Sequence, residues 1–149
     1  MAVIIGIGVA PRSVADASAN MQSAVASARS GCPALQPNPV LNELAQRANL
    51  STDSYILFRA RSQPIGSPKG DVLPALHQMG YSANKAKILS GYGDPEITGY
   101  GDVAAKAIYG AILEGYEAIP DCGYTRLGTD VLQNESKGYA LATVILTDG

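Results

Sequence analysis

The chain has 149 residues, a formal net charge of −2 and a sequence pI near 5.3. This length fits one domain that buries most of its apolar surface, and the composition, with 46% hydrophobic and 16% charged residues, is globular rather than disordered. The small negative charge and the lack of a basic run exclude a nucleic-acid-binding protein, because neutralising phosphates requires a concentrated basic surface.

An apolar run at residues 2–10 opens the chain, and small residues follow it at positions 14–19. This order is typical of the hydrophobic core and cleavage site of a secretory signal peptide, although the basic start is missing. We therefore predict that residues 1–19 are a signal-peptide remnant or N-terminal extension, and that a single domain spans residues 20–149. The alternative is a buried N-terminal strand. The run is too short to cross a bilayer, so no stable membrane span is expected.

Two helices are expected in the first half of the domain. The first covers residues 17–29 and ends at Gly31 and Pro33, as helices commonly do. The second begins at Asn38, a good cap, with Pro39 in the first turn. Its apolar face carries Val40, Leu41, Leu44, Ala45 and Ala48. Residues 55–58 either extend this helix or form a separate turn.

The middle of the chain alternates loops with short elements. Residues 62–70 are expected to be a loop, and residues 71–80 a short helix with Leu73, Leu76 and Met79 facing inward. Residues 85–89 are a candidate strand and residues 91–95 a turn. Asp102 then caps a helix that ends at Gly115. One face of that helix carries Val103, Ala107, Ile108, Ala111 and Ile112.

The C-terminal segment has the pattern of a hairpin, with arms at residues 124–132 and 139–147 and a turn at 133–138. The second arm is apolar on both faces, which favours a central strand that is covered on both sides. Helices come early and strands cluster late. We therefore predict an α+β fold, an α-β-α sandwich with a small antiparallel sheet between helices.

The chain has two cysteines, Cys32 and Cys122. In a reducing cytosol they would be inert thiols, whereas in an exported protein one bridge would close a loop of about ninety residues and contribute about 4 kcal/mol. We hypothesise that a disulfide joins them. Two cysteines and one histidine, remote from one another, make a structural zinc site a poor interpretation, so no metal and no cofactor is expected.

Several short segments occur in an order that is similar to a known family. They are residues 29–35 (RSGCPAL), the Leu41-x-x-x-Ala45 pattern, Gly80-Tyr81 and residues 119–128 (IPDCGYTRLG). In this order they resemble the CAP superfamily of cysteine-rich secretory, antigen 5 and pathogenesis-related proteins, in particular its degenerate bacterial members, over residues 20–147. The resemblance implies an α-β-α fold and a location outside the cytosol, secreted or in the cell envelope.

The family's metal-binding cleft holds two histidines and two acidic residues, and the resemblance does not carry them over. Ala86 and Lys87 stand where a Glu-Asn pair would be, and Gly115 stands where a histidine would be. His77 falls in the third predicted helix, away from these positions. A cleft without these ligands cannot hold the metal in the family's manner, so the resemblance implies the fold without metal chemistry or assigned catalytic residues.

Six of the eight tyrosines follow a glycine, which suits a binding surface as well as ordinary turns. The candidate groove comprises His77, Tyr81, Tyr100, Ile108, Tyr109, Ile112 and Tyr116. We predict a secreted, non-catalytic binding module for an apolar small molecule, a lipid or a cell-envelope partner. One alternative is a hydrolase that uses His77 with a nearby serine or acid, although no G-x-S-x-G motif accompanies it. Another is a structural envelope protein.

Overall fold

The computed structural model describes residues 14–59, 72–99 and 101–149. In chain order its elements are α1 (Val14–Ala28), β1 (Gln36–Pro37), α2 (Pro39–Ile56), α3 (Leu73–Gln78), β2 (Ala86–Gly93), α4 (Val103–Glu114), β3 (Arg126–Asn134) and β4 (Tyr139–Thr147). The loop predicted at residues 62–70, the proposed helix start at Asp71 and the candidate groove residue Tyr100 lie outside the described residues.

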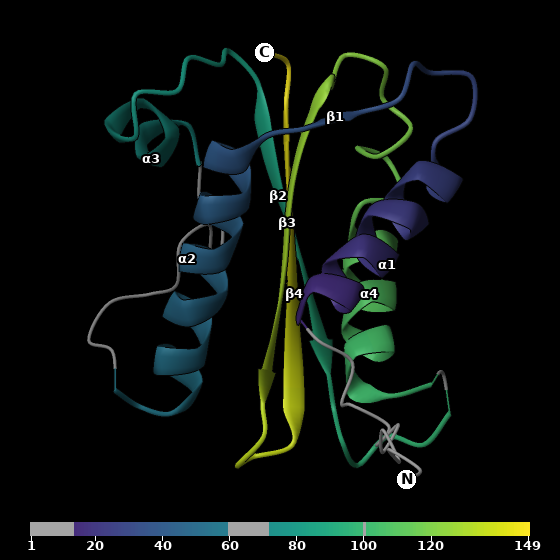
Figure 1. Ribbon diagram of the computed structural model, residues 1–149, viewed down its shortest axis with the longest axis vertical. Helices are drawn as coiled ribbons and strands as arrows, with labels where there is room; N and C mark the ends of the chain where they lie inside the picture. The colour runs from purple at the N-terminus through teal and green to yellow at the C-terminus, as the bar shows by residue number, and fades with distance from the viewer. Residues whose placement is uncertain (1–13, 60–71, 100) are drawn as a thin grey trace, which may run out of the picture.

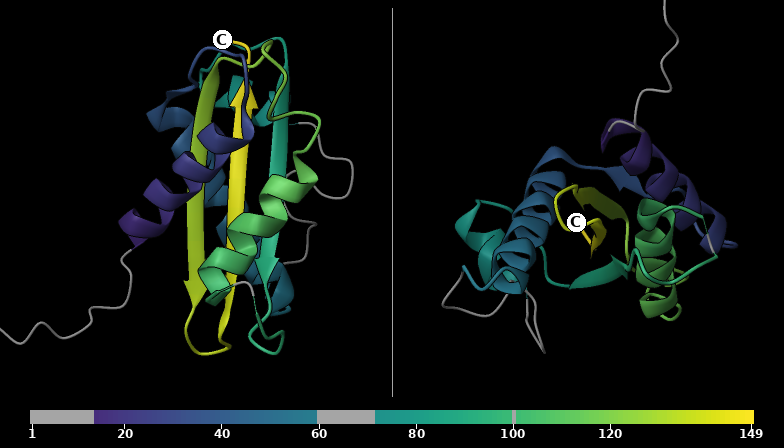
Figure 2. Two further views of the ribbon diagram at one scale, coloured as in Figure 1. Left: turned by 90° about the vertical axis from the view of Figure 1, so that its right-hand side faces the viewer. Right: turned by 90° about the horizontal axis from the view of Figure 1, so that it is seen from below.

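A four-stranded sheet in the order β1-β3-β4-β2 forms the middle layer. Helices α1 and α4 cover one face, and α2 with α3 covers the other (Figure 1; Figure 2). This is the predicted α+β sandwich. The three long strands are antiparallel, but β1 pairs parallel to β3 through Gln36 and Pro37, so the sheet is mixed. The parallel pair arises because the link between α1 and α2 crosses the edge of β3.

Strand β4 lies in the centre of the sheet, and all 9 of its residues are buried. This confirms the interpretation of its two apolar faces. Its partner β3 runs from Arg126 to Asn134, two residues later than predicted, so the hairpin turn is shorter than expected. The pairing continues to Asn134 opposite Tyr139, which brings two residues of the predicted turn into the ladder.

Strand β2 is longer than predicted, because the segment interpreted as a turn at residues 91–95 continues the strand through Gly93. The two glycines are needed for helix packing. A Cβ at Gly91 would lie 1.7 Å from the carbonyl oxygen of Ala107, and one at Gly93 would lie 1.9 Å from that of Val103. Helix α4 therefore rests directly on the backbone of β2, an arrangement that only glycine permits.

Helix α2 rests on the opposite face of the sheet in a similar way. A Cβ at Gly128 on β3 would lie 2.2 Å from the carbonyl carbon of Leu41. The helix begins as predicted, with the Asn38 side chain accepting a hydrogen bond from the Val40 amide at 2.9 Å. It extends to Ile56 and residues 57–58 form a turn, so the segment at 55–58 is half helix and half turn.

Helix α1 begins at Val14 and therefore includes residues that the sequence assigned to the N-terminal extension. Ala17 is only 1% exposed and belongs to the same core cluster as Met21 and Val25. The predicted boundary between residues 19 and 20 thus falls inside a packed helix. Whether the chain is cleaved there stays a prediction, since the helix shows only that Ala17 packs in the core.

Candidate functional site

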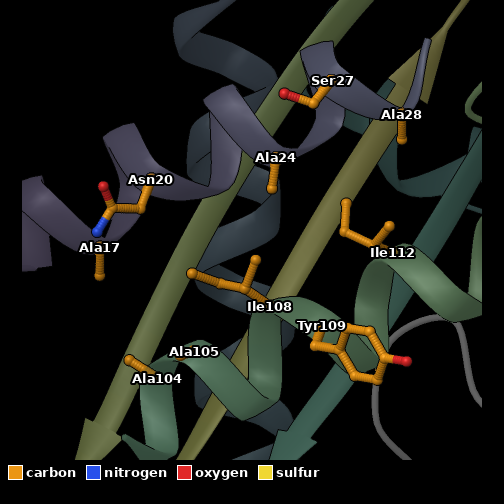
Figure 3. A pocket seen from close by; sticks show the side chains of 10 residues that line it. All are labelled: Ala17, Asn20, Ala24, Ser27, Ala28, Ala104, Ala105, Ile108, Tyr109 and Ile112. Atoms are coloured by element: carbon orange, nitrogen blue, oxygen red, sulfur yellow. The ribbon is translucent and has the colours of Figure 1, made fainter. Parts of the chain in front are cut away.

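An apolar groove of about 480 Å³ lies between α1 and α4 (Figure 3). It is lined by Ala17, Asn20, Ala24, Ser27, Ala28, Ala104, Ala105, Ile108, Tyr109 and Ile112. Figure 3 shows Ala24 and Ala28 of α1 on the side that faces Ile108 and Ile112 of α4. The volume lies within the range of pockets that bind small molecules.

The groove exists because α1 presents small side chains to α4. Ala17, Ala24 and Ala28 recur at helical spacing, so they lie on one face of α1, with Asn20 between the first two. Met21 and Val25, which point to the sheet, are fully buried and hold the helix in place. Alanine side chains are too short to fill the space opposite Ile108 and Ile112. The hollow is therefore a consequence of side-chain size on α1.

The polar side chains in the groove lining are uncharged: Asn20, Ser27 and the half-exposed Tyr109. No histidine, cysteine, carboxylate or amine is among the lining residues. The groove can therefore bury an apolar group and offer hydrogen bonds from amide and hydroxyl groups. Its lining lacks the paired acid and base groups that acid–base chemistry uses.

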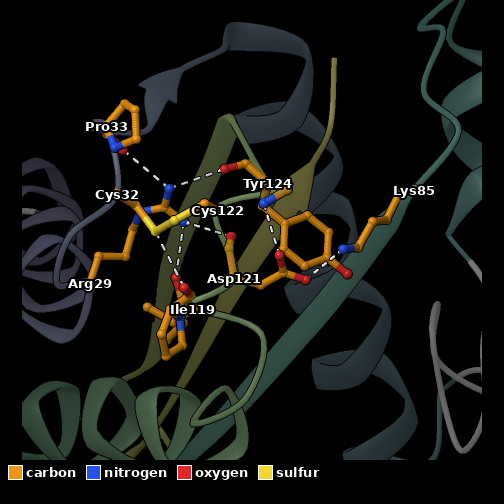
Figure 4. Close-up of a disulfide and its surroundings, with 10 residues drawn as sticks. Arg29, Cys32, Pro33, Lys85, Ile119, Asp121, Cys122 and Tyr124 are labelled. Carbon is orange, nitrogen blue, oxygen red and sulfur yellow. Dashed lines mark hydrogen bonds and ion pairs between the residues drawn. A yellow bond between two sulfur atoms is a disulfide. The ribbon is translucent and has the colours of Figure 1, made fainter.

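A disulfide between Cys32 and Cys122 joins the segments that follow the two helices of the groove (Figure 4). Cys32 comes shortly after the end of α1, and Cys122 comes shortly after the end of α4. The two residues are 90 positions apart in the sequence, with their Cα atoms 5.3 Å apart. The covalent link therefore fixes how far α1 and α4 can separate at this end of the groove.

Arg29 reinforces the same junction. Its Nη1 donates to the carbonyl oxygens of Ile119 at 2.9 Å and Asp121 at 3.1 Å. Its Nη2 donates to those of Pro33 at 3.1 Å and Tyr124 at 3.2 Å. One guanidinium thus satisfies carbonyl groups on both sides of the disulfide, as Figure 4 shows. Arg29 lies in one of the family-like segments, but local sequence does not indicate this role, because most of its partners are distant in the sequence.

A surface ion pair lies beside this junction. Lys85 Nζ is 2.5 Å from Asp121 Oδ2 and 4.3 Å from the centre of the Tyr124 ring. The hydrogen bond between Lys85 and Asp121 lowers the pKa of the Asp121 carboxyl group and raises the pKa of the Lys85 amine. Because both groups are exposed, the pair contributes little to stability. It aligns the loop before β3 with the start of β2.

Of the seven predicted groove residues, the six that the structure describes do not lie in one site. Ile108, Tyr109 and Ile112 line the α1–α4 groove. His77 and Tyr81 lie on the side of the sheet that α2 and α3 cover, because α3 packs there. His77 is exposed, and its Nε2 lies 3.3 Å from the carbonyl oxygen of Ala83.

Tyr81 and Tyr116 have structural contacts of their own. The Tyr81 hydroxyl lies 3.0 Å from Thr147 Oγ1 and also donates to the Gly149 carbonyl, which fixes the C-terminal end of β4. Tyr116 is 72% exposed and donates to the Glu117 carboxylate at 2.9 Å. Both side chains therefore lie outside the lining of the groove.

A buried polar cluster that the sequence did not indicate lies under α2. Asn49 is 2% exposed, and its Nδ2 donates to Asp130 Oδ2 at 2.9 Å and to the Asp130 carbonyl at 3.0 Å. Its Oδ1 accepts a hydrogen bond from Thr143 at 2.6 Å. Burial raises the pKa of the Asp130 carboxyl group, and the Asn49 hydrogen bond only partly offsets this. The cluster joins α2 to β3 and β4.

A second polar cluster lies near the hairpin turn. The Tyr139 hydroxyl donates to Asp53 Oδ1, which also accepts from Asn134 Nδ2 at 2.9 Å. Burial, followed by the hydrogen bond to Asp53, raises the pKa of Tyr139 to about 12. Tyr139 therefore keeps its proton at physiological pH and holds the end of α2 against the hairpin.

Within the described ranges, no group of three or more histidine, cysteine or acidic residues is arranged to hold a metal ion. The carboxylates near the start of α4 have structural partners instead: Asp94 accepts from the Glu96 amide at 2.8 Å, and Asp102 accepts from the Ala105 amide at 2.8 Å. In the same part of the chain, no helix has the length and hydropathy needed to span a membrane.

The fold has a known counterpart. The crystal structure of a cysteine-rich secretory protein from Staphylococcus aureus matches this chain with a TM-score of 0.62 and 13% sequence identity. The match covers 94% of this chain but 41% of that protein, so this chain corresponds to less than half of it. No protein-family model matches the chain, and neither does any curated protein sequence. The similarity therefore supports a shared fold.

Proposed function

We propose that this chain is an exported, non-catalytic CAP-like domain that binds an apolar small molecule, such as a lipid, in the groove between α1 and α4. The observation that carries the proposal is the groove itself, with its stripe of alanines opposite Ile108 and Ile112 and its uncharged polar groups. Export is supported by the disulfide, which persists in oxidising compartments, and by the secretory protein that shares the fold.

The arrangement favours a ligand with an apolar body and an uncharged polar group. The apolar body would replace water along the alanine stripe, which is favourable by about 25 cal/mol per Å² of apolar surface buried. Asn20, Ser27 and Tyr109 offer hydrogen bonds to an ester or hydroxyl group. A free carboxylate or amine would lose hydration in the groove without gaining an opposite charge from the lining.

A titration with the uncharged fluorescent probe N-phenyl-1-naphthylamine tests the proposal. The probe should brighten on saturable binding to the oxidised protein, and a monoacylglycerol should displace it. Ala24→Trp should abolish binding, because the indole fills the groove from α1. The control Gln46→Trp adds the same ring to an exposed position on α2 and should leave binding unchanged.

Equal binding to the two tryptophan variants would place the probe elsewhere on the protein and contradict the proposal. Absence of saturable binding by the wild-type protein would instead favour a structural role. If the probe binds but is displaced by a fatty acid and not by a monoacylglycerol, the groove prefers a charged group. That result would contradict the chemistry of the lining.

A further inference from the structure

The two helices that form the groove are held against the sheet in different ways. Helix α4 rests on the backbone of β2 at Gly91 and Gly93, where a Cβ atom would collide with the helix. Of the glycines that the structure describes, none would place a Cβ atom against α1. Helix α1 instead contacts the sheet through Met21 and Val25, whose side chains are fully buried. Helices packed through side chains can slide by small distances, so α1 is the wall of the groove that can move.

The C-terminal end of α1 is tied to the α4 side of the groove by the disulfide and Arg29. The disulfide joins Cys32, shortly after α1, to Cys122, shortly after α4. Arg29 donates hydrogen bonds to the carbonyl oxygens of Ile119 and Asp121 in the segment that follows α4. Ile119 is fully buried in the core, so this segment is a fixed anchor. Cleavage of the disulfide would leave the end of α1 held by hydrogen bonds alone.

The disulfide lies where a thiol in solution can reach it. Cys122 is exposed and Cys32 is half-buried, and neither belongs to a hydrophobic core cluster. Exposed disulfides are the ones that thiolates attack readily. Arg29 also donates to the carbonyl oxygens of Pro33 and Asp121, the residues next to the two cysteines (Figure 4). A permanent positive charge beside the disulfide favours the thiolate that leaves when the bond is broken.

We propose that the redox state of the Cys32–Cys122 disulfide regulates the groove: the oxidised protein holds an apolar ligand, and reduction by an external dithiol loosens α1 and releases it. The inference rests on the function proposed above, because it concerns the same groove. The partner that it implies is a dithiol reductant in the compartment to which the protein is exported.

The exchange takes place in two steps. A thiolate of the reductant attacks Sγ of the exposed Cys122, a mixed disulfide forms, and Cys32 leaves as a thiolate. The second thiolate of the reductant then attacks its own sulfur in the mixed disulfide, and Cys122 leaves. Two electrons and two protons pass from the dithiol to the two cysteines, and the dithiol becomes a disulfide. An oxidant that accepts two electrons reverses the exchange.

Reduction should loosen α1 without unfolding the protein. The core cluster on the α2–α3 face includes Leu44 and Ile145 and is formed by α2, α3 and the sheet. The hydrogen bond from Arg29 to the Tyr124 carbonyl keeps part of the junction in place. Ala24 and Ala28 line the groove from the half of α1 that leads to the disulfide. Once this half is less ordered, ligand binding must order it again, which lowers the affinity.

The test is a titration of N-phenyl-1-naphthylamine into the protein before reduction, after reduction with dithiothreitol, and after reoxidation. The dissociation constant of the probe should rise by about tenfold or more on reduction and return on reoxidation. The double variant with Cys32→Ser and Cys122→Ser is the matched control. It should bind the probe as weakly as the reduced wild type, with and without dithiothreitol.

Amide hydrogen exchange gives a second readout that needs no ligand. In the reduced protein, exchange should accelerate in α1 while α2 stays protected. Loss of protection in both helices would mean that reduction unfolds the protein, and this would overturn the proposal. A disulfide that dithiothreitol reduces only in urea would also overturn it.

The two readouts separate this inference from the function on which it rests. If the oxidised wild type does not bind the probe, the proposed function fails, whatever happens in α1. If the oxidised and reduced proteins bind the probe equally, the proposed function stands and the regulation is wrong. Unchanged exchange in α1 after reduction would contradict the regulation in either case.

Discussion

The two faces of the sheet are closed in different ways. On the α2–α3 face, large side chains such as Leu41, Leu44 and Leu76 pack against Ile145, and Asn49 forms hydrogen bonds with polar groups of β3 and β4. On the α1–α4 face, alanines meet isoleucines, and a groove remains. The size of the helix side chains therefore decides where the apolar groove forms.

The two faces also differ in what holds their helices. Both α2 and α4 rest on strand glycines, which bring helix and sheet backbones into contact. Helix α1 has no such glycine beneath it among the described residues, and it depends on Met21, Val25 and the junction formed by the disulfide and Arg29. We therefore expect the disulfide to matter more for the groove than for the α2–α3 face.

Removing the disulfide should have the largest effect. Cys32→Ala together with Cys122→Ala frees a loop of 90 residues, and chain entropy predicts a loss of about 4 to 5 kcal/mol in the free energy of unfolding. Denaturant unfolding measures this loss. Amide hydrogen exchange should accelerate more in α1 than in α2. Equal acceleration in both helices would contradict the distinction between the two faces.

Substituting the strand glycines on which α4 and α2 rest should cause the next largest loss of stability. Gly91→Ala and Gly128→Ala each place a methyl group inside the backbone of a packed helix, so each should cost about 3 kcal/mol. The exposed Ser90 lies on the same strand as Gly91, and Ser90→Ala should change stability by less than about 0.5 kcal/mol. A small effect at one glycine alone would show that its helix can move away from the sheet.

The buried amide on the α2–α3 face should have an intermediate effect. Asn49→Ala leaves the Thr143 hydroxyl and the Asp130 oxygens without their partner, at a cost of about 2 kcal/mol. Thr143→Val removes the hydroxyl that needs this partner. The double variant should therefore lose less stability than the sum of the two single variants. Strict additivity in urea unfolding would contradict the network.

The smallest effect we expect is a dependence of stability on pH that arises from the Asp130 carboxyl group. Burial raises the pKa of its carboxyl group in the folded state, so the folded state holds the proton more tightly than the unfolded state does. The stabilising effect is complete below about pH 4 and is lost as the pH rises through the folded-state value. The free energy of unfolding of Asp130→Asn, relative to that of the wild type, should therefore be higher at neutral pH than below pH 4. A difference independent of pH would contradict this assignment.

Local signals predicted much of this architecture. Asn38 and Asp102 have the residue types that helix caps require, and both form the expected hydrogen bonds. The apolar faces of β4 correctly predicted a central strand. The turn predicted at Gly91 and Gly93 is wrong, because one sequence cannot distinguish a glycine that makes a turn from one that lets a helix approach a strand.

The candidate site was harder to predict, because it depends on contacts between distant residues. The apolar pattern of α4 places Ile108 and Ile112 on one face, and both line the groove. The opposite wall on α1 was not identified, since alanines at helical spacing resemble an ordinary packed face. His77 and Tyr81 were grouped with α4 although α3 lies across the sheet. The contact between Asn49 and Asp130 spans 81 residues and has no local signal.

The most direct test of the account is to locate a bound apolar ligand by paramagnetic broadening. An acylglycerol with a nitroxide on its alkyl chain is added to methyl-labelled, oxidised protein. The account predicts selective broadening of the methyl signals of Ala24, Ala28, Ile108 and Ile112, with no broadening at Leu44 or Leu76. Broadening on the α2–α3 face, or none at the groove, would contradict it.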